Sequence, residues 1–440
     1  MSQPTLVLSP QQAAVPAQGG ILDILVRVQA PAQPANTITP PTPKRLALVV
    51  DRSGSMDGQP LEEALNCVAH IAKHLTPQDQ LSLIVYDDNV NVLLPMQPMR
   101  SISLVEQALR GVRSGGSTDL HAGWLAGAQQ LVGGTDQAIS RVILLSDGQA
   151  NHGETRQIEI EAQCRQWLAR GVSTTTVGLG RGFNEDLMIG MARAGGGQNY
   201  YGQTAADLYD SFDEELALLQ AMYLRQIDLK LIPAQGVIVE MLSPIAAQAN
   251  SSYRMTDLAW GAESWLAVRL HVSPSAAGSL RDLLAASVSG CDMEGTTVHA
   301  HAPLLQLPAL DAAALAALPR DAQVADRLLE LEFAKASEHL RKLAEQGDIQ
   351  ATRRALTALE ERFGHHPWLS AKMAQLRRLA EEDVMVMAKE ASYSAMRMSR
   401  RLTSVNEMRF VADETENTMP SYLRKKVSEG RGRQKPNEPQ

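Results

Sequence analysis

The sequence LALVVDRSGS at residues 46–55 places an uninterrupted apolar run directly before a loop of side chains that carry oxygen atoms. A short apolar run without alternation is typical of a strand that is buried on both faces of a parallel sheet. Apolar residues then recur at spacings of three and four from residue 61 to residue 75, which predicts an amphipathic helix. A buried strand, a polar loop and a helix in this order indicate the start of an α/β domain.

The same alternation of strands and helices continues along the next part of the chain. Further strands are expected at residues 81–86, 141–145, 172–177 and 198–201, and helices at 102–110, 120–132, 155–169, 185–194 and 205–219. Strands that alternate with helices predict a doubly wound, Rossmann-like α/β fold with helices on both faces of the sheet. We assign residues 44–220 to this domain.

The segments that flank the α/β domain have the pattern of a β-sandwich. Residues 21–30 are rich in apolar and β-branched residues, and residues 224–308 alternate polar and apolar residues between turns. A lone strand would leave its backbone hydrogen-bonding groups unpaired. We therefore predict that residues 1–43 contribute one or more strands to a sandwich completed by residues 221–308, with the α/β domain inserted between them.

The final part of the chain changes character twice. Residues 309–404 have helical periodicity, with Gly347 and Gly364 as helix ends, and predict a small helical bundle. Residues 405–440 lose this periodicity and become charged, with a basic cluster at residues 424–426. This composition predicts a flexible basic tail, either solvated or serving as a linear docking motif that orders on a partner.

Composition limits the classes of function. The 440 residues are 44% hydrophobic and 20% charged, which is globular composition. A net charge of −8 and an aromatic content of only 4% argue against a nucleic-acid partner. The three cysteines are far apart and predict no disulfide framework, and no apolar run reaches the ~18 residues of a membrane span. We therefore expect a cytoplasmic protein without a signal peptide or a membrane span.

Three loops carry the residues that have metal-binding chemistry. Their oxygen-bearing side chains are Asp51, Ser53 and Ser55 in the first loop, Thr118 in the second and Asp147 in the third. In a doubly wound sheet, ligands bind beyond the carboxyl ends of the strands at the point where the strand order reverses. Hydroxyl and carboxylate oxygens suit Mg²⁺, Mn²⁺ or Ca²⁺ rather than zinc. If the neutral hydroxyls bind directly and the carboxylates act through water, the ion keeps enough charge to accept an external carboxylate.

These loops resemble those of a von Willebrand factor A (vWA) domain with a metal-ion-dependent adhesion site. The family pattern D-x-S-x-S, then a Thr, then an Asp after a later strand, is matched by Asp51, Ser53, Ser55, Thr118 and Asp147. The resemblance implies that the three hydroxyls touch the metal and that the two carboxylates hold it largely through water. It covers residues 44–220, and the flanking segments are similar to bacterial proteins labelled as calcium-activated chloride channel-like.

Other side chains with chemical potential favour structural roles. Cys67, His70 and His74 lie on one side of the first helix and could bind zinc, but no further ligand is near them in the sequence. Their place beside the apolar stripe favours a polar flank and a buried thiol. Ser53 and Ser55 have no neighbouring histidine that would act as a base. We therefore predict no catalytic residues, no cofactor-binding residues and no enzymatic activity.

These observations predict a metal-dependent protein–protein interaction module that acts as a cytoplasmic scaffold or adaptor. Its ion, Mg²⁺ with Ca²⁺ or Mn²⁺ as alternatives, would bind an Asp or Glu side chain of a protein partner. The alternative is a regulatory subunit of a larger machine, such as an AAA+ ATPase or a kinase–phosphatase system. The catalytic partner would then be a separate protein, because this chain has no nucleotide-binding motif.

Overall fold

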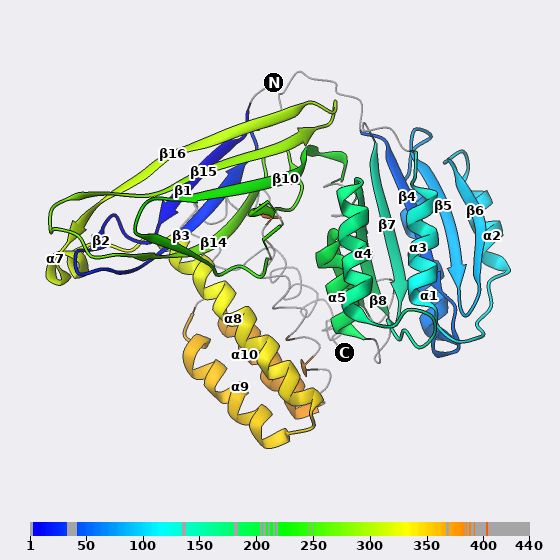
Figure 1. The fold of residues 1–440 in the computed structure, drawn as a ribbon. Coiled ribbons are helices and arrows are strands. Elements are labelled where there is room, and N and C mark those ends of the chain that lie inside the picture. The colour runs from blue at the N-terminus through cyan, green and yellow to red at the C-terminus, as the bar shows by residue number, and fades with distance from the viewer. Residues whose placement is uncertain are drawn as a thin grey trace, which may run out of the picture.

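The structure, a computed structural model, describes residues 3–32, 42–133, 138–179, 184–202 and 402–403, together with most of 205–391. Within that last range the description omits residues 206–207, 210–211, 214–215, 217–218, 246, 249, 367–368, 383, 385–386 and 389–390. The predicted tail at 405–440 lies outside the described residues. Figure 1 shows a sandwich of strands on one side, an α/β domain on the other, and helices that descend from the sandwich.

The α/β domain contains a six-stranded sheet in the order β6-β5-β4-β7-β8-β9. The strands are β4 (Lys44–Asp51), β5 (Gln80–Tyr86), β6 (Val90–Pro98), β7 (Ile139–Ser146), β8 (Val172–Leu179) and β9 (Gly196–Gly202). All neighbours are parallel except β5 and β6. The sequence pattern does not predict β6, and its two prolines, Pro95 and Pro98, suit only an edge position because proline cannot donate to a ladder.

Helices cover both faces of this sheet, as expected. They are α1 (Gln59–Lys73), α2 (Ile102–Arg110), α3 (Leu120–Gln130), α4 (Gln157–Ala169) and α5 (Glu185–Ala194). The apolar side chains of α1 and α2 join one core with Leu46, Leu48 and Val50 of β4. Those of α3, α4 and α5 join a second core with Ala47 and Val49 of the same strand. Every residue of β4 and β7 is buried, which explains their uninterrupted apolar runs.

Two further sheets form the sandwich. One has the order β1-β3-β14-β11, with β17 also paired to β14, and the other has the order β12-β10-β15-β16-β2, with β13 also paired to β10. The first sheet contains β1 (Thr5–Pro10), β3 (Gly20–Gln29), β11 (Val237–Met241), β14 (Glu263–Val272) and β17 (Leu402–Thr403). The second contains β2 (Val15–Pro16), β10 (Met222–Pro233), β12 (Ser252–Arg254), β13 (Leu258–Ala259), β15 (Leu280–Asp292) and β16 (Thr297–Leu310). Apolar residues from both sheets form one shared core.

The pairing of the N-terminal strand with the later sheet is confirmed. β3 and β14 pair antiparallel from Gln29↔Glu263 to Gly20↔Val272. Two ion pairs reinforce this register across the strands, between Arg27 and Glu263 at 2.7 Å and between Arg269 and Asp23 at 2.7 Å. The α/β domain is therefore inserted in the chain between β3 and the remaining strands of the sandwich.

The described part of the helical region includes α7 (Ala312–Ala317), α8 (Ala322–Glu345), α9 (Ile349–Phe363) and α10 (Leu369–Glu382). Apolar side chains from α8, α9 and α10 share a small core that includes Phe333 and Phe363. α8 also packs on the sandwich, where Val324 contacts the cluster around Trp265. Two strands contain residues of the range 309–404, which the sequence predicts to be helical. β16 continues to Leu310, and β17 pairs with β14.

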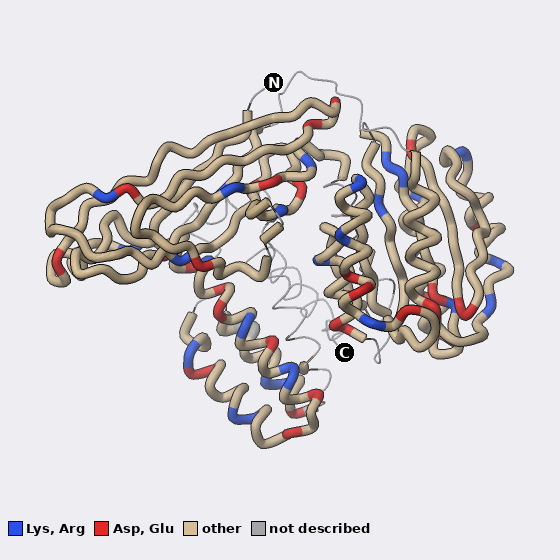
Figure 2. Tube along the Cα trace, in the orientation of Figure 1, with Lys and Arg blue, Asp and Glu red and all other residues tan. Residues whose placement is uncertain are grey.

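Charge is mixed over the surface that the structure describes. Figure 2 shows basic and acidic residues interspersed along α8, α9 and α10, without a stripe of one sign. Among the described residues, no helix is both long enough and apolar enough to cross a membrane.

Candidate metal centre

The three predicted loops meet at one edge of the α/β sheet. Asp51 is the last residue of β4, and Asp147 directly follows β7, the parallel neighbour of β4. From β4 the chain continues to β5 on one side, and from β7 it continues to β8 on the other. The strand order therefore reverses between β4 and β7, and the loops lie at the crevice that this reversal creates.

Asp51 is fully buried at the base of this site and is held by hydrogen bonds to both of its oxygens. Its Oδ1 accepts the backbone N–H of Ser53 at 2.9 Å. Its Oδ2 accepts the hydroxyls of Ser146 at 2.6 Å and Tyr86 at 3.1 Å. Burial raises the pKa of Asp51, the bonds from Ser146 and Ser53 oppose that rise, and the nearby charge of Asp147 adds to it. A divalent cation beside the two carboxylates would relieve this repulsion.

The hydroxyls of the first loop have the spacing of two ligands of one ion. Ser53 Oγ and Ser55 Oγ are 3.2 Å apart. Neighbouring oxygens around an octahedral Mg²⁺ ion, with bonds of 2.0–2.1 Å, are separated by about 3 Å. Ser53 is buried, whereas Ser55 is exposed, so the pair lies at the boundary between protein and solvent. The residues present therefore fit a divalent cation that prefers oxygen ligands.

Backbone hydrogen bonds fix the second loop against the first. The N–H of Gly115 donates to the carbonyl of Arg52 at 2.8 Å, and the N–H of Gly54 donates to the carbonyl of Gly116 at 3.2 Å. Gly116 has φ +70°, and a Cβ there would lie 2.2 Å from Asp88 Oδ1, so a larger residue would be strained. These contacts bring the loop that carries the buried Thr118 to the edge formed by the other two loops.

The third loop is tied to the start of α5. The N–H of Gly148 donates to Ser146 Oγ at 2.8 Å, and the N–H of Asn184 donates to the carbonyl of Asp147 at 2.8 Å. Asn184 is the N-cap of α5, and its side chain accepts the N–H of Leu187. The position of Asp147 therefore depends on where α5 begins.

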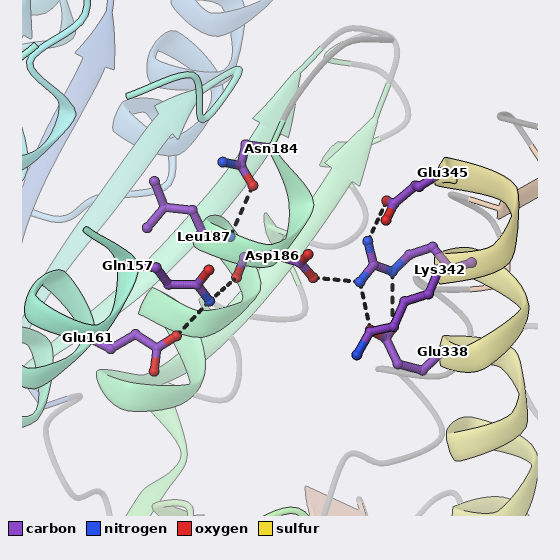
Figure 3. Close-up of polar contacts among 9 residues, drawn as sticks. Gln157, Glu161, Asn184, Asp186, Leu187, Glu338, Lys342 and Glu345 are labelled. Atoms are coloured by element: carbon purple, nitrogen blue, oxygen red, sulfur yellow. Dashed lines mark hydrogen bonds and ion pairs between the residues drawn. The ribbon is translucent and has the colours of Figure 1, made fainter. Parts of the chain in front are cut away.

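α5 is in turn held by the helical region. Figure 3 shows Asp186 of α5 facing Glu338 and Glu345 of α8. The buried guanidinium of Arg341 lies between them and donates to Asp186 at 2.5 Å, to Glu338 at 2.6 Å and to Glu345. Burial alone would lower the pKa of Arg341, but the hydrogen bond and charge of Glu338 and the charges of Asp186 and Glu345 raise it. A continuous set of contacts thus leads from α8 to the loop of Asp147.

The structure brings the predicted residues Asp51, Ser53, Ser55, Thr118 and Asp147 to one edge of the sheet. It adds residues that the sequence analysis does not identify. Tyr86 and Ser146 fix the Asp51 carboxylate, and Asn151 accepts the N–H of Thr118 at 2.8 Å. One sequence feature could identify Tyr86 and Ser146. They are the last residues of β5 and β7, so they lie at the same carboxyl edge of the sheet as Asp51.

The fold and these loops agree with a comparison against known families. The von Willebrand factor type A domain family matches residues 46–214. Residues 46–214 form a VWA domain. This segment contains all five predicted metal-site residues, and VWA domains commonly mediate protein–protein interactions.

Two relatives match part of this chain. An uncharacterised protein from Synechocystis is 25% identical over 215 residues, which are 49% of this chain and 50% of that protein. Human inter-alpha-trypsin inhibitor heavy chain H3 is 28% identical over 191 residues, which are 40% of this chain and 21% of that protein. The chain therefore spans half or less of the length of these relatives.

Solved structures resemble nearly the whole chain. A von Willebrand factor type A protein from Catenulispora acidiphila has a TM-score of 0.70 at 17% identity, covering 91% of this chain and 97% of that one. VWA2, the ArnB paralog from Sulfolobus acidocaldarius, has a TM-score of 0.58 at 15% identity, covering 91% of this chain and all (100%) of that one. The combination of a VWA domain with the surrounding parts thus occurs in other proteins.

Proposed function

We propose that the VWA domain binds a divalent cation at a metal-ion-dependent adhesion site and uses it to capture an acidic side chain of a protein partner. Asp51, Ser53, Ser55, Thr118 and Asp147 would hold the ion, with Mg²⁺ preferred and Ca²⁺ or Mn²⁺ as alternatives. The observation that supports this most is the Ser53–Ser55 hydroxyl pair, 3.2 Å apart and open to solvent on one side.

The carboxylates are arranged to leave positive charge on such an ion. Both oxygens of Asp51 already accept hydrogen bonds from the protein, so this group faces inward. Asp147 Oδ1 accepts the N–H of Gln149 at 3.1 Å. An ion bound directly by neutral hydroxyls and only indirectly by these carboxylates attracts an anionic oxygen from outside.

The same geometry favours binding over catalysis. The Ser53 hydroxyl pairs with the Ser55 hydroxyl rather than with a histidine that would act as a base. We therefore propose a non-enzymatic scaffold or adaptor. The sandwich and α8–α10 would supply further contact surface around the VWA domain, and three free thiols suit a reducing compartment such as the cytoplasm.

Metal binding is tested with the full chain and Mn²⁺, followed by electron paramagnetic resonance of the free ion. We expect the wild-type chain to bind Mn²⁺ and to release it to excess Mg²⁺. Ser53→Ala should weaken Mn²⁺ binding at least tenfold because it removes a direct ligand. Ser103→Ala, which removes an exposed hydroxyl at the start of α2, is the control and should bind like the wild type. Equal affinity in Ser53→Ala and Ser103→Ala would refute the assigned site.

A further inference from the structure

A second group of ligand-type side chains lies at the end of α1. His70 is in the last turn of α1, His74 caps that helix, and Asp213 lies between β9 and β10. His70 Nε2 is 2.8 Å from Asp213 Oδ1, and His74 Nε2 is 3.7 Å from the same oxygen. One ligand atom from each residue lies within 4.8 Å of the other two. We infer that His70, His74 and Asp213 form a binding site for a transition-metal cation, with Zn²⁺ as its representative.

The ring of His74 is already oriented for this role, whereas His70 Nε2 donates to the Asp213 carboxylate and would exchange that hydrogen for the ion. His74 Nδ1 is 2.9 Å from the carbonyl oxygen of His70, and because a carbonyl only accepts, Nδ1 must carry the hydrogen. The lone pair of the neutral ring is then on Nε2, the atom that faces Asp213. The ring of His70 stacks on Tyr209 with centroids 4.1 Å apart, which fixes its plane. A hydrogen bond on the far nitrogen and a fixed ring plane are typical of metal-binding histidines.

The ligand set differs from the triple suggested by spacing along α1. Cys67 is fully buried in the apolar core under α1, and its sulfur is not among the ligand atoms that gather at His70 and His74. Asp213 takes its place from 143 residues beyond His70, where sequence spacing gives no signal. Histidines four residues apart on one helix lie on the same face and can bind one ion together.

The chemistry of this site separates it from the oxygen site at the loops. Two imidazole nitrogens and one carboxylate oxygen suit Zn²⁺ and other late first-row cations, whereas Mg²⁺ prefers oxygen ligands alone. Three protein ligands also leave a fourth position open to solvent. An ion bound here would fasten the end of α1 to the segment that leads into β10, and would stabilise the folded VWA domain because only the folded chain assembles these ligands.

The test is competition between the full chain and a chromophoric zinc chelator. We expect the wild-type chain to withdraw Zn²⁺ from the chelator, and we expect His74→Gln and Asp213→Asn each to weaken binding at least tenfold. His301→Gln removes an exposed histidine of β16 and should leave the affinity unchanged. Because His74 and Asp213 are about half exposed, both variants should fold, which circular dichroism would verify.

Two outcomes would overturn the inference. One is a wild-type chain that withdraws no Zn²⁺, and the other is Zn²⁺ binding that His74→Gln and Asp213→Asn leave unchanged. Ser53→Ala separates the two metal sites, because it should weaken Mn²⁺ binding and leave Zn²⁺ binding intact. His74→Gln should have the opposite selectivity. Each site can therefore fail its test without affecting the result for the other.

Discussion

Replacing Arg341 by methionine should loosen the start of α5, although Arg341 belongs to α8. Arg341 is 2% exposed and donates to three carboxylates, one of which is Asp186 in the first turn of α5. Methionine keeps much of the apolar stem of arginine and removes the charge, so the change addresses the ion pairs more than the packing. The affected contact is the one that joins the helical region to the VWA domain (Figure 3).

The expected loss of stability follows from the solvent exposure of the three carboxylates that Arg341 contacts. Removing one member of a fully buried ion pair costs about 3–5 kcal/mol because the remaining charge is stranded. Here the remaining carboxylates are 38–54% exposed and can be solvated again. Exposed pairs contribute about 0.2–1 kcal/mol each. Three such contacts to one buried guanidinium should together stabilise the contact by about 1–2 kcal/mol.

Hydrogen exchange measured by mass spectrometry reports this change directly. A loss of 1–2 kcal/mol should speed exchange of protected amides in α5 by about 5–30-fold. Arg362→Met is the matched control, because Arg362 pairs with Glu332 where both side chains are at least half exposed. It should change exchange little. Unchanged exchange of α5 in Arg341→Met would show that the contact between α8 and α5 contributes nothing in solution.

Three further outcomes are expected. Tyr86→Phe should lower the free energy of unfolding by about 1.5 kcal/mol in urea titrations, because a buried donor to a carboxylate is lost, whereas Tyr253→Phe on β12 should cost less than half as much. Ellman's reagent should modify Cys291 in the native chain. It should leave Cys67 and Cys164 unmodified until urea unfolds the chain, because burial raises the pKa of both thiols. Removing β1, β2 and β3 should speed hydrogen exchange in β14 more than in β4, since β14 loses a paired neighbour; equal rates would contradict this.

The fold follows from the sequence where one local rule decides the structure. The apolar run before Asp51 predicts a buried parallel strand, and an orphan strand at residues 21–30 requires a partner, which β14 supplies. β6 is missed because its apolar run at residues 92–94 is short and is followed by two prolines, which favour a loop or an edge. The return of the chain at Leu402–Thr403 to pair with β14 is likewise invisible in local periodicity.

At the candidate site, too, the sequence predicts the local features and misses the contacts between distant parts of the chain. Motif spacing identifies Asp51, Ser53 and Ser55 because these residues are neighbours in the chain. Tyr86 and Ser146 reach Asp51 from other strands, and only the sheet order shows that their ends meet. Asp213 is the extreme case, because its approach to His70 depends on how the segment after β9 packs on α1. Contacts between distant parts of the chain are therefore what sequence reasoning cannot supply.

Capture of a carboxylate by the ion at the Ser53–Ser55 site is the central claim, and water-proton relaxation with bound Mn²⁺ tests it most directly. Water at the open position of Mn²⁺ enhances proton relaxation, and a carboxylate that binds there displaces it. We predict that acetate, or a peptide containing a single aspartate, lowers the enhancement in the wild-type chain, whereas the same peptide with asparagine does not. The opposite result has two parts: Mn²⁺ binds at this site, as shown by its loss in Ser53→Ala, and no carboxylate alters the relaxation enhancement. That result would contradict the account.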